Sequence, residues 1–149
     1  MIAVSLVLIV TITGTVYLNN FNTQQKLNQA NNEIESMVKL AQNYAKIKQS
    51  PVGNSDEVLY VRLKKNGSSI EADINGIGTT YFSNKINESG LTVTFTPSEF
   101  YFWGGSGKLS ADANGTFLDA DETFNISIAL NQGTSETKTI VINSLGGIQ

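Results

Sequence analysis

The feature that most constrains the fold is the first fifty residues, Met1–Ser50, which read as one long helix with two characters. Residues 1–18 contain no charged side chain, and Lys26 is the first charged residue of the chain. From residue 19 to residue 48, apolar residues recur at steps of three and four, the period of an amphipathic helix. Such a helix extends well beyond any core that the remaining residues can form, so part of it needs another partner.

One face of the second half of the helix is built for packing. Its apolar positions are Phe21, Leu27, Ala30, Ile34, Met37 or Val38, Ala41 and Tyr44 or Ala45. Glu35 and Lys39 form a favourably oriented pair one turn apart. We expect this face to pack on the protein's own sheet, whereas the apolar first half has no such partner within the chain.

The apolar first half has three interpretations. At 18 residues it is at the short edge of the ~20 that span a bilayer. A cleaved secretory signal is disfavoured, because no Lys or Arg precedes the apolar run and no small-x-small site follows it. A buried core helix is the third alternative. The sequence favours a membrane anchor and assembly helix, with Gly14 permitting close helix contact. Its candidate assembly residues are Leu6, Ile9, Val10, Gly14 and Phe21.

Residues 51–149 are predicted to form a β-rich head. The helix should stop at Ser50-Pro51-Val52-Gly53-Asn54, and Asn66-Gly67, Asn75-Gly76 and Asn114-Gly115 are turn signals. Pro97 should end a strand or mark an edge. The expected strands are Val58–Lys64, Ser69–Ile74, Thr79–Ser83, Leu91–Thr96, Phe100–Trp103, Phe124–Leu130 and Thr137–Asn143. The predicted fold class is α+β: residues 1–50 form a transmembrane and assembly stalk, and residues 51–149 form an antiparallel β-sheet head that closes over its amphipathic half.

Composition restricts the chemistry. The 149 residues include no Cys and no His, which excludes thiol catalysis, zinc–thiolate sites and imidazole base catalysis. Residues 1–50 carry a net charge of +2 and the remainder −5. An acidic head is a poor binder of nucleic acid, because phosphate contacts need a basic face. With no catalytic constellation, we predict that the protein is not an enzyme.

One acidic stretch is a candidate metal site. Asp112, Asn114, Asp119 and Asp121 supply oxygen ligands of the kind that calcium prefers, although their spacing fits no complete motif. The alternative is an exposed acidic loop in which Asp and Asn form turns.

Two further patterns have structural alternatives. The sequence matches the N-glycosylation pattern at Asn66, Asn87, Asn114 and Asn125, and we expect these asparagines to be unmodified. The run Tyr101-Phe102-Trp103 could form an aromatic binding platform, but core packing is the favoured interpretation.

The whole arrangement resembles a type IV pilin or a type II secretion pseudopilin, nearest the H-type minor pseudopilin and related minor pilins. Three stretches carry the resemblance: residues 19–27 (NNFNTQQKL), residues 37–45 (MVKLAQNYA) and residues 139–147 (TIVINSLGG). The resemblance implies copies of itself or other pilins as partners in a helical filament. It also implies a prepilin peptidase, assembly machinery and a bacterial inner membrane that holds the subunit before assembly, with the head outside.

The N-terminus departs from the family pattern. Family members begin with a short basic leader, and the fifth mature residue is a Glu, whereas this chain has Ser5 and no leader. An ungapped alignment to the family helix puts that Glu at or just before Met1. We therefore expect Met1 to be an internal residue of a longer prepilin; the alternative is a mature chain that begins at Met1.

The favoured function is structural, as a subunit of a type IV pilus-like filament or a secretion pseudopilus. The first alternative is a minor pilin at the filament tip, binding a secreted protein, a surface or DNA. A membrane-anchored domain that does not polymerise is the second alternative.

Overall fold

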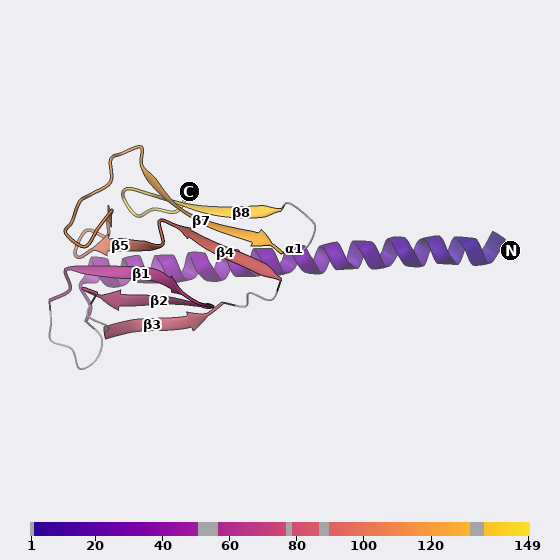
Figure 1. Ribbon diagram of the computed structural model, residues 1–149, viewed down its shortest axis with the longest axis horizontal. Helices are drawn as coiled ribbons and strands as arrows, with labels where there is room; N and C mark the ends of the chain where they lie inside the picture. The colour runs from indigo at the N-terminus through magenta and orange to yellow at the C-terminus, as the bar shows by residue number, and fades with distance from the viewer. Residues whose placement is uncertain (1, 51–56, 77–78, 87–89, 132–135) are drawn as a thin grey trace.

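The computed structural model describes residues 2–50, 57–76, 79–86, 90–131 and 136–149; for residues 2–20 it describes the backbone only. Helix α1 (Ile2–Ile47) is followed by a β-rich head (Figure 1). The strands are β1 (Tyr60–Asn66), β2 (Ser69–Ile74), β3 (Thr79–Lys85), β4 (Leu91–Thr96), β5 (Glu99–Trp103), β6 (Leu109–Ser110), β7 (Thr123–Leu130) and β8 (Thr137–Asn143). The predicted fold class, a long helix packed on an antiparallel β head, is confirmed.

The head divides into two antiparallel sheets instead of the single sheet that the sequence suggested. One has the strand order β3-β2-β1-β5-β6, and the other has the order β4-β7-β8. The chain passes from the second sheet to the first at Pro97, directly after β4 ends at Thr96. The rings of Phe95, Phe100 and Phe124 stack in series, 5.1 and 5.2 Å apart, and so join the sheets across the core.

The C-terminal half of α1 forms the other side of the core. Its buried residues follow the predicted helical stripe: Leu27, Ala30, Ile34, Met37, Val38, Ala41 and Ala45. They pack against alternate residues of the strands, including Val61 and Leu63 of β1, which are fully buried. The apolar face that the helical period creates and the apolar faces that strand alternation creates thus pack together in one core.

The helix ends with a capping turn. Lys48 has a φ of 49°, and the backbone N–H of Gln49 donates to the carbonyl of Tyr44, a pattern that closes many helix C-termini. The helix therefore stops before Pro51, and the predicted stop signal at residues 51–54 lies outside the described residues.

A buried amide fixes the chain terminus to the helix. The Gln42 Nε2 atom donates to the carbonyls of Gly107 and Leu145, each at 3.2 Å. Gly146 has a φ of +81°, and a Cβ there would lie 2.4 Å from the Gln42 Nε2 atom. The terminal glycine turn that the sequence indicated is thus required for the close approach of this turn to α1.

We predict that Gly146→Ala lowers the free energy of unfolding more than Gly90→Ala does. Both glycines have left-handed φ values, but a Cβ at Gly90 meets nothing within 4 Å. Strain alone should cost about 1–2 kcal/mol at Gly90, and the contact with Gln42 adds to it at Gly146. Urea unfolding of the two full-length variants measures the difference, and equal losses would contradict the account.

Candidate functional site

The N-terminal half of α1 extends beyond the head as a free stalk (Figure 1). The predicted assembly residues Leu6, Ile9, Val10 and Gly14 lie on this helical backbone, where the spacing of the first three puts them on one side. Within the described residues, no helix combines the length and the hydropathy that crossing a membrane requires.

Phe21 lies where the stalk leaves the head. Its side chain is 52% exposed, whereas Leu27, six residues on, is 2% exposed. The prediction that Phe21 begins the head-facing stripe was therefore wrong, because the sheets end before they reach it. Its predicted assembly role stays a prediction, and an exposed aromatic ring at this point is consistent with it.

The exposed side of α1 satisfies many of its polar groups within the helix. Asn31 donates to Glu35 at 2.7 Å, and Gln29 donates to Glu33 at 3.0 Å. The predicted pair of Glu35 and Lys39 is confirmed, with 3.4 Å between Nζ and Oε2. Among the residues whose side chains are described, the large apolar side chains exposed on the helix are Phe21, Leu40 and Ile47.

A polar groove of about 960 Å³ lies between α1 and β3. Its helical wall runs from Gln25 to Met37 and is rich in Asn and Gln, and Ser83, Asn84 and Lys85 form its other wall. At the opposite end of β3, the Tyr44 and Tyr81 rings stack 4.4 Å apart. The strand is therefore held against the helix at one end, and the groove opens at the end nearer the free stalk.

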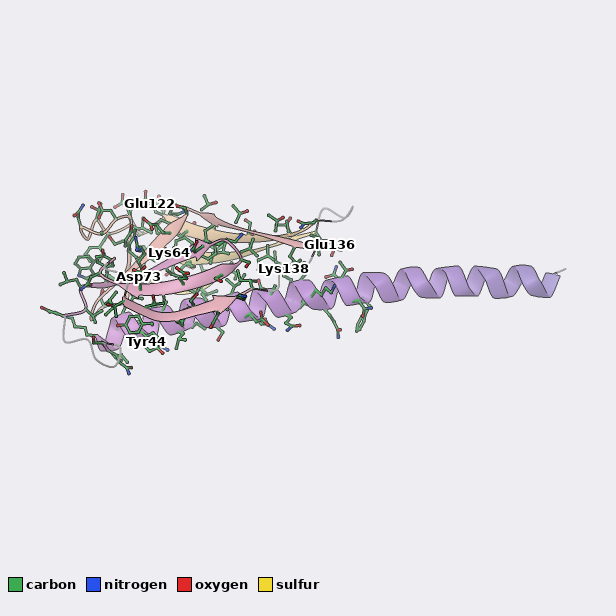
Figure 2. The ribbon with its side chains drawn as sticks, turned by 60° about the horizontal axis from the view of Figure 1, so that its bottom comes forward. Tyr44, Lys64, Asp73, Glu122, Glu136 and Lys138 are labelled. Carbon is green, nitrogen blue, oxygen red and sulfur yellow. The ribbon has the colours of Figure 1, made fainter. Side chains whose placement is uncertain are left out.

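The outer face of β1 and β2 carries an ion-pair network. The side chain of Asp73 is only 3% exposed, and its two oxygens accept hydrogen bonds from Arg62 Nε and Nη2 at 3.1 and 2.8 Å. Lys64 Nζ lies 3.3 Å from the same carboxylate (Figure 2). Glu99 lies 3.5 Å from Arg62. The Asp73 hydrogen bonds raise the pKa of Arg62 further above its ordinary value, so the guanidinium stays charged.

The run Tyr101-Phe102-Trp103 divides between the two faces of β5. Phe102 is fully buried in the core, while Tyr101 donates a hydrogen bond to Glu99 on the outer face. Trp103 is half-buried and packs its ring against Phe117, with centroids 5.9 Å apart. The core interpretation holds for Phe102, and the neighbouring rings cover the outer face of the sheet.

The predicted calcium residues lie in the loop between β6 and β7. Asp112 Oδ1 accepts hydrogen bonds from the backbone N–H groups of Asn114 and Thr116, which lower its pKa. The described residues contain no group of three or more His, Cys, Asp or Glu side chains placed to hold a metal. Asp112 thus acts here as a turn former, and the calcium site stays a prediction.

The glycosylation matches fall in different settings. Asn66 is the exposed last residue of β1, Asn114 lies in an exposed turn, Asn125 is a half-buried residue of β7, and Asn87 lies outside the described residues. The expectation that they are unmodified stays a prediction.

The overall geometry is shared with a solved protein. The crystal structure of the type IV minor pilin FimU from Pseudomonas aeruginosa strain PAO1 is similar to this chain, with a TM-score of 0.62 at 15% sequence identity. The similarity covers 87% of this chain and 90% of that one. The chain has the fold of a type IV minor pilin. No protein-family model matches its sequence, and no curated protein sequence matches it significantly.

The ion-pair network is the element that the sequence analysis missed. The residues of the turn between β1 and β2 are Gly67 and Ser68, and the register that this turn sets places Arg62 opposite Asp73 and Lys64 opposite Glu71. Counting outward from Asn66-Gly67 as the two turn residues would have placed Arg62 opposite Glu71, so this sequence signal does not find the two pairs.

We predict that Asp73→Ala lowers the free energy of unfolding by roughly 3 kcal/mol, because it leaves Arg62 partly buried without its main partner. The matched control is Glu71→Ala, which removes a 3.8 Å contact with Lys64 and two exposed hydrogen bonds, from Asn66 and Ser83, and should cost less than about 1 kcal/mol. Urea unfolding compares the two variants. A loss for Asp73→Ala no larger than that for Glu71→Ala would show that the network does not stabilise the head.

We predict that two tyrosines of the folded chain ionise late. Burial raises the pKa of Tyr81 and of Tyr101 to about 12, above the ordinary value of 10.0. The folded state therefore holds these protons more tightly, so their contribution to stability is complete below pH 10 and is lost as the pH rises from 10 towards 12.

Ultraviolet titration of phenolate absorbance measures this ionisation. Tyr101→Phe should remove one late-ionising group from the titration curve. If all the tyrosines of the wild-type chain ionise together near pH 10, the predicted burial of Tyr81 and Tyr101 is wrong.

Proposed function

We propose that this chain is a structural subunit of a type IV pilus-like filament or of a type II secretion pseudopilus. The observation that carries the proposal is the division of α1. Its C-terminal half is packed into the head, while its uncharged N-terminal half extends beyond the head. The fold shared with a minor pilin supports the same proposal.

In this proposal the stalks pack side by side at the centre of the filament, and the heads coat the outside. Burial of apolar side chains between stalks supplies the cohesion. Because each copy contacts the next through a different surface, the polymer is open and helical. The partners are other copies of the chain or related pilins, and the head performs no catalysis.

Before assembly, the apolar half of α1 holds the subunit in the bacterial inner membrane with the head outside. A prepilin peptidase and the assembly machinery then act on it, and the head ends in an extracellular or periplasmic filament. This part of the proposal is supported by the apolar sequence of residues 1–18.

The minor-pilin identity of FimU supports a minor role for this chain, of the H-type or a related kind. A minor subunit is scarce in the filament and needs partner pilins, whereas a major subunit dominates it.

Electron microscopy of filaments sheared from native cells, with mass spectrometry of their subunits, tests both the structural role and the minor role of this chain. Filaments that contain the chain support the proposal, and its abundance distinguishes a minor from a major subunit. Complete absence of the chain from such filaments would overturn the structural role.

We predict that Ile9→Lys abolishes incorporation into filaments, because it would bury an unpaired charge between stalks at a cost of several kcal/mol. The matched control is Asn43→Lys, which places the same charge on the exposed side of the helix beside the head. Immunoblots of sheared filaments measure incorporation, and thermal unfolding checks that both heads fold. Normal incorporation of Ile9→Lys would rule out close stalk packing at this position.

A further inference from the structure

The free backbone edges of the head are distributed unevenly. The β4 edge is covered where Lys65 Nζ donates to the Val93 carbonyl at 2.9 Å. The β6 edge is covered where the N–H of Leu109 donates to the Ser144 carbonyl at 3.0 Å. Covered edges of this kind prevent unwanted strand pairing.

Two edge segments lack such cover. The C-terminal residues pair with the end of β8, where the N–H of Gln149 donates to the Val141 carbonyl, but they do not reach Thr137–Thr139. In the described part of the chain, no further backbone partner lies beyond that segment or beyond Ser83–Lys85 of β3. These two segments are therefore open to strand pairing with another chain.

The two open segments lie on opposite sides of the head but at the same end of it. Figure 1 shows β3 and β8 at opposite edges. Gln24, near the point where the stalk leaves the head, donates to Glu136 just before β8. Lys85, at the end of β3, lines the groove together with Gln25. Copies that stand side by side with parallel stalks would therefore bring β8 of one copy beside β3 of the next.

The strand directions suit this contact. β3 begins near Tyr81, which stacks on Tyr44, and ends at the groove near Gln25, so it runs towards the N-terminus of α1. β8 begins near Gln24, and the chain after it reaches Gln42 through the Leu145 carbonyl, so it runs the other way. In copies with parallel stalks the two strands would be antiparallel, a pairing that ordinary β-sheets use.

The charges of the two surfaces are complementary. The groove carries Glu33 and Lys85, and the start of β8 carries Glu136 and Lys138 (Figure 2). Within the described residues, none of the four makes an ion pair in the isolated chain. Contact between the two surfaces therefore allows each basic side chain to form an ion pair with an acidic side chain of the neighbouring copy.

The side-chain directions agree with the charges. Lys138 is on the same side of β8 as the buried Ile140, the side that faces the core, and Glu136, just before β8, faces α1 through the hydrogen bond it accepts from Gln24. With the stalks of both copies on the inner side, these side chains enter the groove, whose wall of Asn and Gln amides offers both donors and acceptors.

We propose that Thr137–Thr139 of one copy pairs with Ser83–Lys85 of the next, with Glu136 and Lys138 entering its α1–β3 groove. The occupant of the groove is a second copy of this chain. The inference rests on the proposed filament function with copies of this chain as neighbours, as in a major subunit, because it is the parallel stalks of adjacent copies that align the two edges. A chain that is only a trace component of the filament would overturn it. The contact joins different surfaces, so it continues from copy to copy without closing into a dimer.

Cysteine cross-linking in cells that express the full chain tests the contact. The wild type has no cysteine, so introduced pairs are unambiguous. Asn84→Cys is combined in turn with Thr137→Cys, Lys138→Cys and Thr139→Cys, which covers both faces and neighbouring registers. Paired strands bring Cα atoms to about 4.5–5.5 Å, within the range of a disulfide. Asn84→Cys with Thr94→Cys, an exposed residue of β4, is the matched control.

The expected result is an oxidation-dependent ladder of trimers and longer species for at least one test pair and for no single variant. Filaments that form normally while no test pair exceeds the Asn84→Cys and Thr94→Cys control would overturn the contact and leave the proposed function standing. If the wild-type chain enters no filament, the proposed function fails and this inference fails with it.

A charge exchange gives a second test. In chains that also carry the cross-linking cysteine pair, Lys85→Glu and Glu136→Lys should each reduce the yield of cross-linked species severalfold. The two substitutions together should restore that yield. Equal ladders in all three variants would show that the charges of the groove do not take part.

Discussion

The structure depends on the burial of one helical stripe, from Leu27 to Ala45, under two sheets. An isolated helix is marginal in water, and each large apolar side chain buried here contributes roughly 2 kcal/mol towards holding α1 on the head. The strands supply the other side of the core through residues such as Val61 and Leu63. Neither layer could bury its apolar face alone, so the fold of the head and the direction of the stalk are set together.

This packing determines what the rest of the helix can do. Because the stripe ends at Leu27, the apolar N-terminal part of α1 extends beyond the head and is available to other molecules. The Gln42 amide fixes the β5–β6 turn and the C-terminal turn to the last part of the helix. The head is thus rigidly attached to its stalk, which is the property that an ordered array of subunits requires.

The sequence predicted most of this architecture, because helical and strand periods are local signals. The apolar stripe of α1, the β1–β2 hairpin near Asn66-Gly67 and the end of β4 at Thr96 could all be predicted from such local signals. The division of the head into two sheets could not be predicted from the sequence, since it depends on long-range pairing such as that of β1 with β5. The short strand β6 has two residues and no period to detect.

The candidate site was predicted in part. The apolar half of α1 stands out by composition alone, but Phe21 was placed in the head-facing stripe because the sequence does not say where the sheets end. The groove between α1 and β3 is lined by residues about fifty positions apart in the sequence, and no pattern within either segment predicts it. The position of Asp73 opposite Arg62 could not be derived from the Asn66-Gly67 signal, because the turn residues in the structure are Gly67 and Ser68, which changes the strand register.

The most direct test of the central claim is a cryo-electron microscopy reconstruction of filaments that contain this chain. The account predicts N-terminal helices packed along the filament axis, with the heads outside. Filaments in which the heads meet at the centre, or in which the stalks have no contact with one another, would contradict it.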